Sequence, residues 1–182
     1  MRFLAALFAA AALLSVNLQA SGQAGRRAPG FSLPDRNQKQ HDLYDYRGKV
    51  VVLDIIQTAC PACQKFTRIS EKLKQKYGER VAILSIVTLP DNLNTVRKFI
   101  ATFNVTTPVL FDCGQAAASY VQATPDKPNV HMPQLFLIDQ NGIIQRHYEH
   151  SADTKEVFEG DGSLLMREID KLLSATRPVK AD

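Results

Sequence analysis

One stretch of the sequence, residues 49–63, joins a short apolar run to a pair of cysteines and reads KVVVLDIIQTACPAC. The run is rich in Val and Ile and too short for a helix, so it predicts a buried β-strand. The cysteines have the spacing Cys-x-x-Cys and precede an amphipathic pattern that predicts a helix. The chain therefore has to place both cysteines after the end of a strand, in the first turn of the helix that follows it.

This position predicts different roles for the two cysteines. Cys60 is expected at the N-cap and Pro61 at the first helical position, where the missing N–H of proline costs nothing. The free amides of the first turn and the positive end of the helix dipole favour a thiolate on Cys60. Cys63 lies one turn further on, within disulfide reach and better buried. We predict that Cys60 is the attacking thiol and Cys63 the resolving thiol.

An acidic residue, Asp54, interrupts the apolar run six positions before Cys60. Its side chain is expected to point the same way as Val50 and Val52, and so to be at least partly buried. A buried carboxylate has a raised pKa and can exchange a proton with a neighbouring thiol near neutral pH. Asp54 is therefore a candidate proton carrier, with a solvated aspartate at the end of the strand as the alternative.

The N-terminal segment has the pattern of an export signal. Arg2 is followed by an apolar run over residues 3–14 and by small residues that end at Ala20. The run is short for a membrane span, and an uncleaved membrane anchor is the alternative interpretation of this segment. Export to an oxidising compartment, most simply the periplasm, is expected. The predicted organisation is a signal peptide at 1–20, a linker at 21–28, one domain at 29–176 and a frayed tail at 177–182.

Strand and helix patterns alternate through the rest of the chain, which predicts an α/β fold with a parallel core and reactive groups at the carboxyl ends of the strands. Residues 31–43 read as an N-terminal hairpin. Asp91 is expected to cap a helix, and Asn141-Gly142 to turn between two antiparallel strands. The other expected elements are a helix from Pro61 to Tyr77, strands at 81–87, 108–111, 134–139 and 143–148, a helix at 115–121, a loop at 149–162 and a helix at 163–174.

Composition excludes some classes of protein. The net charge is +4, but the basic residues after Cys63 alternate with Glu71 and Glu79, which indicates a solvated helix face. No nucleic-acid-binding motif is found, so no nucleic-acid partner is expected. Three cysteines are too few for a scaffold held together by disulfides.

Residues 49–63, together with Met132-Pro133 and LFLIDQNG at 135–142, resemble the thioredoxin superfamily, most closely its exported TlpA-like (redoxin) branch. The resemblance covers residues 28–150. It implies a thioredoxin-like α/β fold, with a central mixed β-sheet flanked by helices and an added N-terminal β-hairpin. It also implies thiol-disulfide exchange by Cys60 and Cys63 with no cofactor other than their disulfide, and a cis Pro133 that faces it. Ala59 stands where the family usually has Trp.

The resemblance implies an exported thiol-disulfide oxidoreductase, more often a reductase than an oxidant. Its partners would be protein disulfides such as those of apocytochrome c, and a membrane protein that donates electrons. The chain is expected to be a monomer. The substrate groove is expected along four residues: Pro61, Ala62, Met132 and Pro133.

Three alternatives remain open. Cys60, Cys63 and His131 could bind copper, because a histidine at this place resembles the ligand of copper-delivery proteins that share the fold. Those proteins, however, have three residues between their cysteines. A peroxiredoxin-type antioxidant needs Thr where this chain has Gln57. Cys113 could be a third redox thiol or a metal ligand, but we expect a small buried residue without a redox role.

Overall fold

The computed structural model describes residues 23–124, 126 and 130–175, so the predicted signal peptide and frayed tail lie outside the described residues. Its centre is a mixed sheet with the strand order β5-β4-β3-β6-β7. β3, β4 and β5 are parallel, whereas β6 is antiparallel to both β3 and β7. These strands are β3 (Val50–Ile56), β4 (Val81–Val87), β5 (Val109–Phe111), β6 (Gln134–Ile138) and β7 (Ile144–Glu149).

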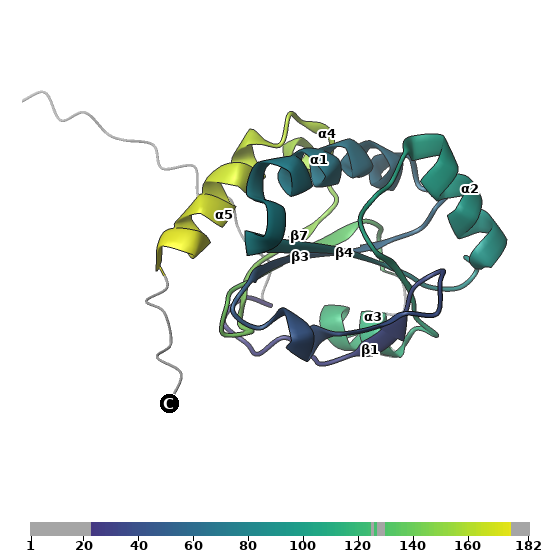
Figure 1. Ribbon diagram of the computed structural model, residues 1–182, viewed down its shortest axis with the longest axis horizontal. Helices are drawn as coiled ribbons and strands as arrows, with labels where there is room; N and C mark the ends of the chain where they lie inside the picture. The colour runs from purple at the N-terminus through teal and green to yellow at the C-terminus, as the bar shows by residue number, and fades with distance from the viewer. Residues whose placement is uncertain (1–22, 125, 127–129, 176–182) are drawn as a thin grey trace, which may run out of the picture.

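Helices cover both faces of this sheet (Figure 1). One face carries α1 (Pro61–Tyr77), α2 (Leu93–Phe103), α4 (Lys155–Glu159) and α5 (Ser163–Ala175), and the other carries α3 (Gln115–Val121). The predicted N-terminal hairpin is present as β1 (Ser32–Pro34) paired with β2 (Gln40–Asp42), on the α3 side. Short 3-10 turns span Leu43–Tyr46 and Gly78–Arg80. The predicted thioredoxin-like architecture is confirmed.

The long helix α1 packs against the sheet through one stripe of apolar side chains. Phe66, Ile69, Leu73 and Tyr77 recur at helical spacing, and all four side chains are buried against the sheet. The helix ends at Gly78, whose φ of 54° lies in the region that favours glycine. The stripe fixes the rotation of α1, and thereby the direction in which its first turn faces.

Two segments differ from the expectation. Residues 149–162, expected as a loop, contain the short helix α4, because Val157 and Phe158 bury their side chains beneath it. Within the expected linker, the amides of Gly25 and Ala28 donate to backbone carbonyls of Ile144 and Gly142, so this segment runs beside the start of β7.

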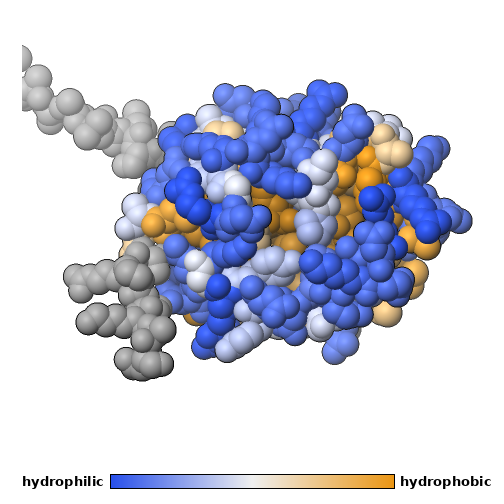
Figure 2. Space-filling view, in the orientation of Figure 1, coloured by the Kyte–Doolittle hydropathy of each residue, from blue (hydrophilic) through white to orange (hydrophobic). Residues whose placement is uncertain are grey.

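Figure 2 shows hydrophobic residues in a band between the layer of α1 and the layer of α3, framed by hydrophilic residues above and below. No helix within residues 23–124 or 130–175 is long and apolar enough to cross a membrane.

Candidate active site

The two cysteines of the Cys-x-x-Cys motif lie where the sequence predicts them. Cys60 is the N-cap of α1, and Pro61 begins the helix. The backbone N–H of Cys63 donates to Sγ of Cys60 at 3.3 Å, so one free amide of the first turn is directed at this sulfur. Both thiols are free, with Cys60 partly exposed and Cys63 only 1% exposed. An incoming sulfur can therefore reach Cys60 but not Cys63.

The loop before β6 lies against the first cysteine. The Met132–Pro133 peptide bond is cis, as the family resemblance implies. The thiol of Cys60 donates to the carbonyl oxygen of Met132 at 3.7 Å. Pro133 is buried, Ala62 is buried on the first turn of α1, and Pro61 is exposed beside it. Among the residues of the expected groove, Met132 supplies the hydrogen-bond acceptor for the thiol of Cys60.

Asp54 is buried in β3, with 2% of its surface exposed. The hydroxyl of Ser85, its neighbour in β4, donates to Oδ1 of Asp54 at 2.8 Å. Burial raises the pKa of Asp54 to about 7, although the hydrogen bond from Ser85 acts in the opposite direction. The carboxyl group can consequently gain or lose a proton near neutral pH, whereas the solvated alternative does not hold.

The chemistry of Cys63 is governed by the same environment. Burial raises the pKa of the Cys63 thiol, and the neighbouring Cys60 and Asp54 raise it further. Cys63 therefore holds its proton at neutral pH until a base removes it. The sequence assigned the attacking role to Cys60 from position alone, and the burial and raised pKa of Cys63 support the resolving role for that thiol.

A network of hydrogen bonds from the β4–α2 loop holds the segment that carries Cys60. Oδ2 of Asp91 accepts the backbone N–H of Thr58 at 2.9 Å, and Oδ1 accepts the hydroxyl groups of Thr58 and Thr95. The prediction that Asp91 caps α2 is wrong, because Asn92 is the N-cap and forms the capping box with Thr95. Asp91 instead accepts hydrogen bonds from Thr58, two residues before Cys60, and so holds the backbone there.

Replacing Asp91 by alanine is expected to loosen this segment. The change leaves the amide of Thr58 without its acceptor, and hydrogen bonds to a charged group are worth about 1.5–3 kcal/mol each. We expect the free energy of unfolding to fall by about 2–3 kcal/mol and the rate of disulfide exchange by about tenfold, because Cys60 is no longer held in place. Denaturant unfolding and exchange kinetics measure both quantities. The exposed Asp153 provides the control, and Asp153→Ala should change neither. Equal exchange rates for Asp91→Ala and Asp153→Ala would contradict a positioning role.

A second polar network, which was not predicted, holds the backbone of the segment that contains Met132. The side-chain amide of Gln134 donates to the carbonyl of His131 at 2.7 Å, so its Oε1 must accept from Nε2–H of His147, at 2.5 Å. Burial lowers the pKa of His147 to about 4, which keeps the ring neutral as it stacks on Phe136. Gln134 is the one polar residue of β6 and was an available signal, whereas His147 lies among other polar residues of β7 and does not stand out in the sequence.

Two other predicted residues lie differently. His131 is exposed, and among the residues that the structure describes no three His, Cys, Asp or Glu side chains are placed to hold a metal ion. The copper set of Cys60, Cys63 and His131 is therefore not assembled. Cys113 was expected to be buried, which is wrong: it follows the end of β5 and is exposed.

Comparison with known proteins agrees with this geometry. The chain matches the AhpC/TSA family over residues 24–147. It is 29% identical over 138 residues to thioredoxin-like protein YneN of Bacillus subtilis, covering 74% of this chain and 76% of that protein. It is 32% identical over 123 residues to thiol-disulfide oxidoreductase ResA of Geobacillus thermodenitrificans, covering 67% of each.

Solved structures share the fold at lower sequence identity. One is the thioredoxin domain of thiol-disulfide oxidoreductase BVU-2223 from Bacteroides vulgatus, with a TM-score of 0.63, 18% identity, and coverage of 80% of this chain and 97% of that one. Another is a secreted disulfide oxidoreductase from Mycobacterium tuberculosis, with a TM-score of 0.64, 16% identity, and coverage of 78% and 96%. With its thioredoxin-like sheet and the match that spans residues 24–147, this chain belongs to the AhpC/TSA family, a redoxin group of the thioredoxin superfamily.

Proposed function

We propose that this protein is an exported thiol-disulfide oxidoreductase that reduces protein disulfides through Cys60 and Cys63. The observation that carries the proposal is the asymmetry of the pair. Cys60 is partly exposed and its sulfur accepts an amide N–H at a helix N-terminus, while Cys63 is buried and its pKa is raised in part by the carboxyl group of Asp54. One accessible nucleophile and one sheltered resolving thiol are what disulfide exchange requires.

The reaction proceeds through a mixed disulfide. The thiolate of Cys60 attacks one sulfur of the substrate disulfide, and the other sulfur leaves as a thiolate that takes a proton. Cys63 then loses its proton and attacks Sγ of Cys60, which releases the second substrate thiol. Two electrons and two protons pass to the substrate, and the protein is left with a Cys60–Cys63 disulfide. A dithiol donor must reduce that disulfide before the next cycle.

Asp54 supplies the base for the second step. Because its pKa is about 7, an appreciable fraction is ionised at neutral pH and can accept the proton of Cys63. The carboxylate also disfavours a thiolate on Cys63, since it raises the pKa of that thiol. A dithiol whose thiolates are poorly stabilised gives up its electrons readily, and this supports reduction rather than oxidation of the substrate.

The remaining parts of the proposal concern place and partners. The apolar N-terminal run supports export, and the secreted M. tuberculosis protein shares the fold. In an oxidising compartment the dithiol needs a partner that brings electrons from the membrane. Substrates would be exported proteins with reducible disulfides, and the family resemblance suggests apocytochrome c among them.

The reduction potential of the Cys60–Cys63 pair tests the direction of electron flow. We expect a value near that of thioredoxin, about −270 mV, when the mature protein is equilibrated against dithiothreitol or glutathione buffers. Cys113→Ser is the matched control and should leave the potential unchanged, because Cys113 takes no part in the couple. A potential near −120 mV would mark a donor of disulfides and would contradict the reductase proposal.

A further inference from the structure

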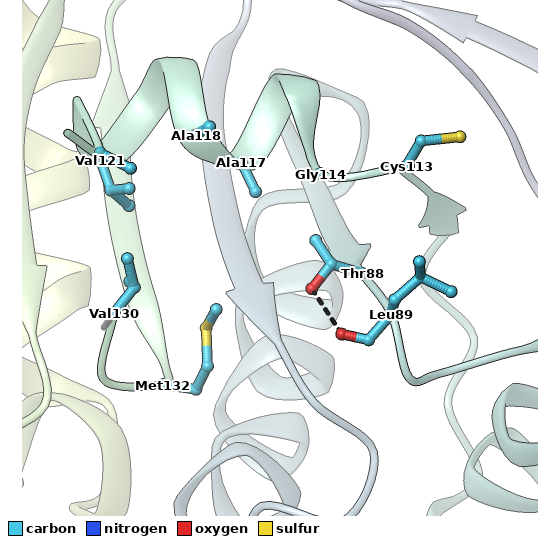
Figure 3. Close-up of a pocket in the computed structure, with 10 residues that line it drawn as sticks. Thr88, Leu89, Cys113, Gly114, Ala117, Ala118, Val121, Val130 and Met132 are labelled. Atoms are coloured by element: carbon cyan, nitrogen blue, oxygen red, sulfur yellow. Dashed lines mark hydrogen bonds between the residues drawn. The ribbon is translucent and has the colours of Figure 1, made fainter. Parts of the chain in front are cut away.

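The hydrogen bond between the redox pair and the loop before β6 is made by a backbone group. The side chain of Met132 lies among the residues that line a pocket of about 430 Å³ beside α3 (Figure 3). Its carbonyl oxygen is the atom that accepts the thiol of Cys60, at 3.7 Å. A backbone carbonyl has no rotamers of its own, so its direction depends on how the adjoining peptide groups are held.

The carbonyl groups on both sides of Met132 have fixed partners. The backbone N–H of His150 donates to the carbonyl of Pro133 at 3.2 Å. The side-chain amide of Gln134 donates to the carbonyl of His131 at 2.7 Å. These two bonds hold the chain on either side of the Met132 carbonyl and leave that carbonyl directed at the redox pair. The first bond joins backbone groups, whereas the second depends on one side chain that can be exchanged.

Gln134 is itself held by a buried partner. Its Oε1 accepts the Nε2–H of His147 at 2.5 Å, and the ring of His147 stacks on Phe136, with 4.2 Å between centroids and 6° between planes. Gln134 and His147 are 2% and 5% exposed, so water has little access to replace either bond of the amide. The side chain therefore has one orientation, in which its nitrogen faces the carbonyl of His131.

The hydrogen bond to Met132 belongs to one redox state of the pair. The reduced protein has a hydrogen on the sulfur of Cys60 to donate, and the Cys60–Cys63 disulfide has none. The carbonyl of Met132 therefore stabilises the dithiol relative to the disulfide as long as it faces this sulfur. Whatever holds the carbonyl in place raises the reduction potential of the pair.

We propose that Gln134, held by His147, is a positioning residue for the redox pair: it directs the Met132 carbonyl at the sulfur of Cys60 and so sets part of the reduction potential. The inference rests on the proposed function, because it assigns a role in the Cys60–Cys63 couple. A side chain with only a structural role would stabilise the oxidised and reduced chains alike and would leave the equilibrium between them unchanged.

Equilibration of the full chain with dithiothreitol tests the proposal. The Cys60–Cys63 disulfide takes up two electrons and two protons, and dithiothreitol becomes its cyclic disulfide; alkylation and mass spectrometry give the reduced fraction. Gln134→Met keeps a side chain of similar length but removes both polar groups. We expect the equilibrium constant for reduction to fall about threefold or more, which makes the potential more negative by about 14 mV or more, at about 30 mV per tenfold change.

Variants of His147 separate the hydrogen bond from the packing. His147→Phe keeps a ring to stack on Phe136 but offers no N–H to Gln134, so it should lower the equilibrium constant about twofold or more. His147→Gln supplies an amide N–H near the place of Nε2 and should restore the constant to within about 1.5-fold of the wild type. Gln145→Met is the matched control: it removes an amide near the start of β7 that bonds to Asp139, and should leave the constant unchanged.

The outcomes separate this role from the proposed function. Unchanged constants in both Gln134→Met and His147→Phe would overturn the positioning role, and so would a fall in His147→Gln as large as that in His147→Phe. If a single variant does not fold, the double variant Gln134→Met/His147→Phe takes its place with the same expected fall, because an apolar pair leaves neither Oε1 nor the ring N–H unpaired. A wild-type chain whose Cys60–Cys63 disulfide neither forms nor is reduced by dithiothreitol would contradict the proposed function instead.

Discussion

Replacing Cys60 by serine is expected to abolish disulfide exchange, with a loss of at least about a thousandfold, as for removal of other catalytic nucleophiles. The hydroxyl of serine stays protonated at neutral pH, and it forms no disulfide. Cys63 cannot substitute, because it is 1% exposed and burial raises the pKa of its thiol. The rate at which a disulfide-linked peptide releases its thiol measures the effect.

Cys63→Ser should have a different result. Cys60 can still attack, but no resolving thiol follows, so the mixed disulfide with the substrate accumulates. Mass spectrometry under non-reducing conditions should show one substrate molecule bound per protein chain, and dithiothreitol should release it. The pair of variants thus separates attack from resolution.

Cys113→Ser is the control for both substitutions, since Cys113 is exposed and is the third free thiol of the chain. It should retain wild-type turnover and trap no adduct. Full activity in Cys60→Ser, or an adduct at Cys113 in Cys63→Ser, would contradict the assignment of the attacking thiol.

The sequence was most informative where structure is local. The stripe of α1 and the buried run of β4 follow from residues that are neighbours in the chain, and both elements lie where the periodicity predicts them. The short helix α4 was missed, because its two apolar residues lie within a polar segment and become informative only when the sheet is present to bury them.

For the candidate site the same distinction holds. Cys60, Cys63 and Asp54 are separated by fewer than ten residues, so strand and helix geometry alone places them together. The contacts of Ser85 with Asp54 and of Asp91 with Thr58 join segments about thirty residues apart in the sequence. No local pattern fixes such pairs, although Ser85 stands out as the one polar residue of a buried strand.

Asp54→Asn is expected to have the second-largest effect, and its sign follows from proton binding. The pKa of Asp54 is about 7 in the folded protein against 3.8 for the ordinary group. Between these two pH values the folded chain keeps a proton that the unfolded chain has released, so stability falls as the pH rises from about 4 to about 7. The shift of about three pH units, at 1.36 kcal/mol per unit, amounts to about 4 kcal/mol.

Asparagine removes this titration. At pH 8 the reduced Asp54→Asn variant should therefore be more stable than the reduced wild type by up to about 4 kcal/mol, and the difference should shrink towards zero near pH 4. Denaturant unfolding of both reduced proteins between pH 4 and pH 8 measures this difference. A difference that does not change with pH would contradict a buried carboxyl group that titrates near 7.

The same substitution should slow resolution, because an amide cannot accept the proton of Cys63. The pH profile of exchange should lose an ionisation near pH 7, which a purely structural effect would not remove. Ser85→Ala supplies the matched control: it keeps the carboxyl group but removes the hydrogen bond that lowers the pKa of Asp54, so the ionisation should move to higher pH. Loss of the ionisation in Asp54→Asn together with its upward shift in Ser85→Ala would identify Asp54 as the proton carrier. An unchanged profile in both variants would assign the proton to another group.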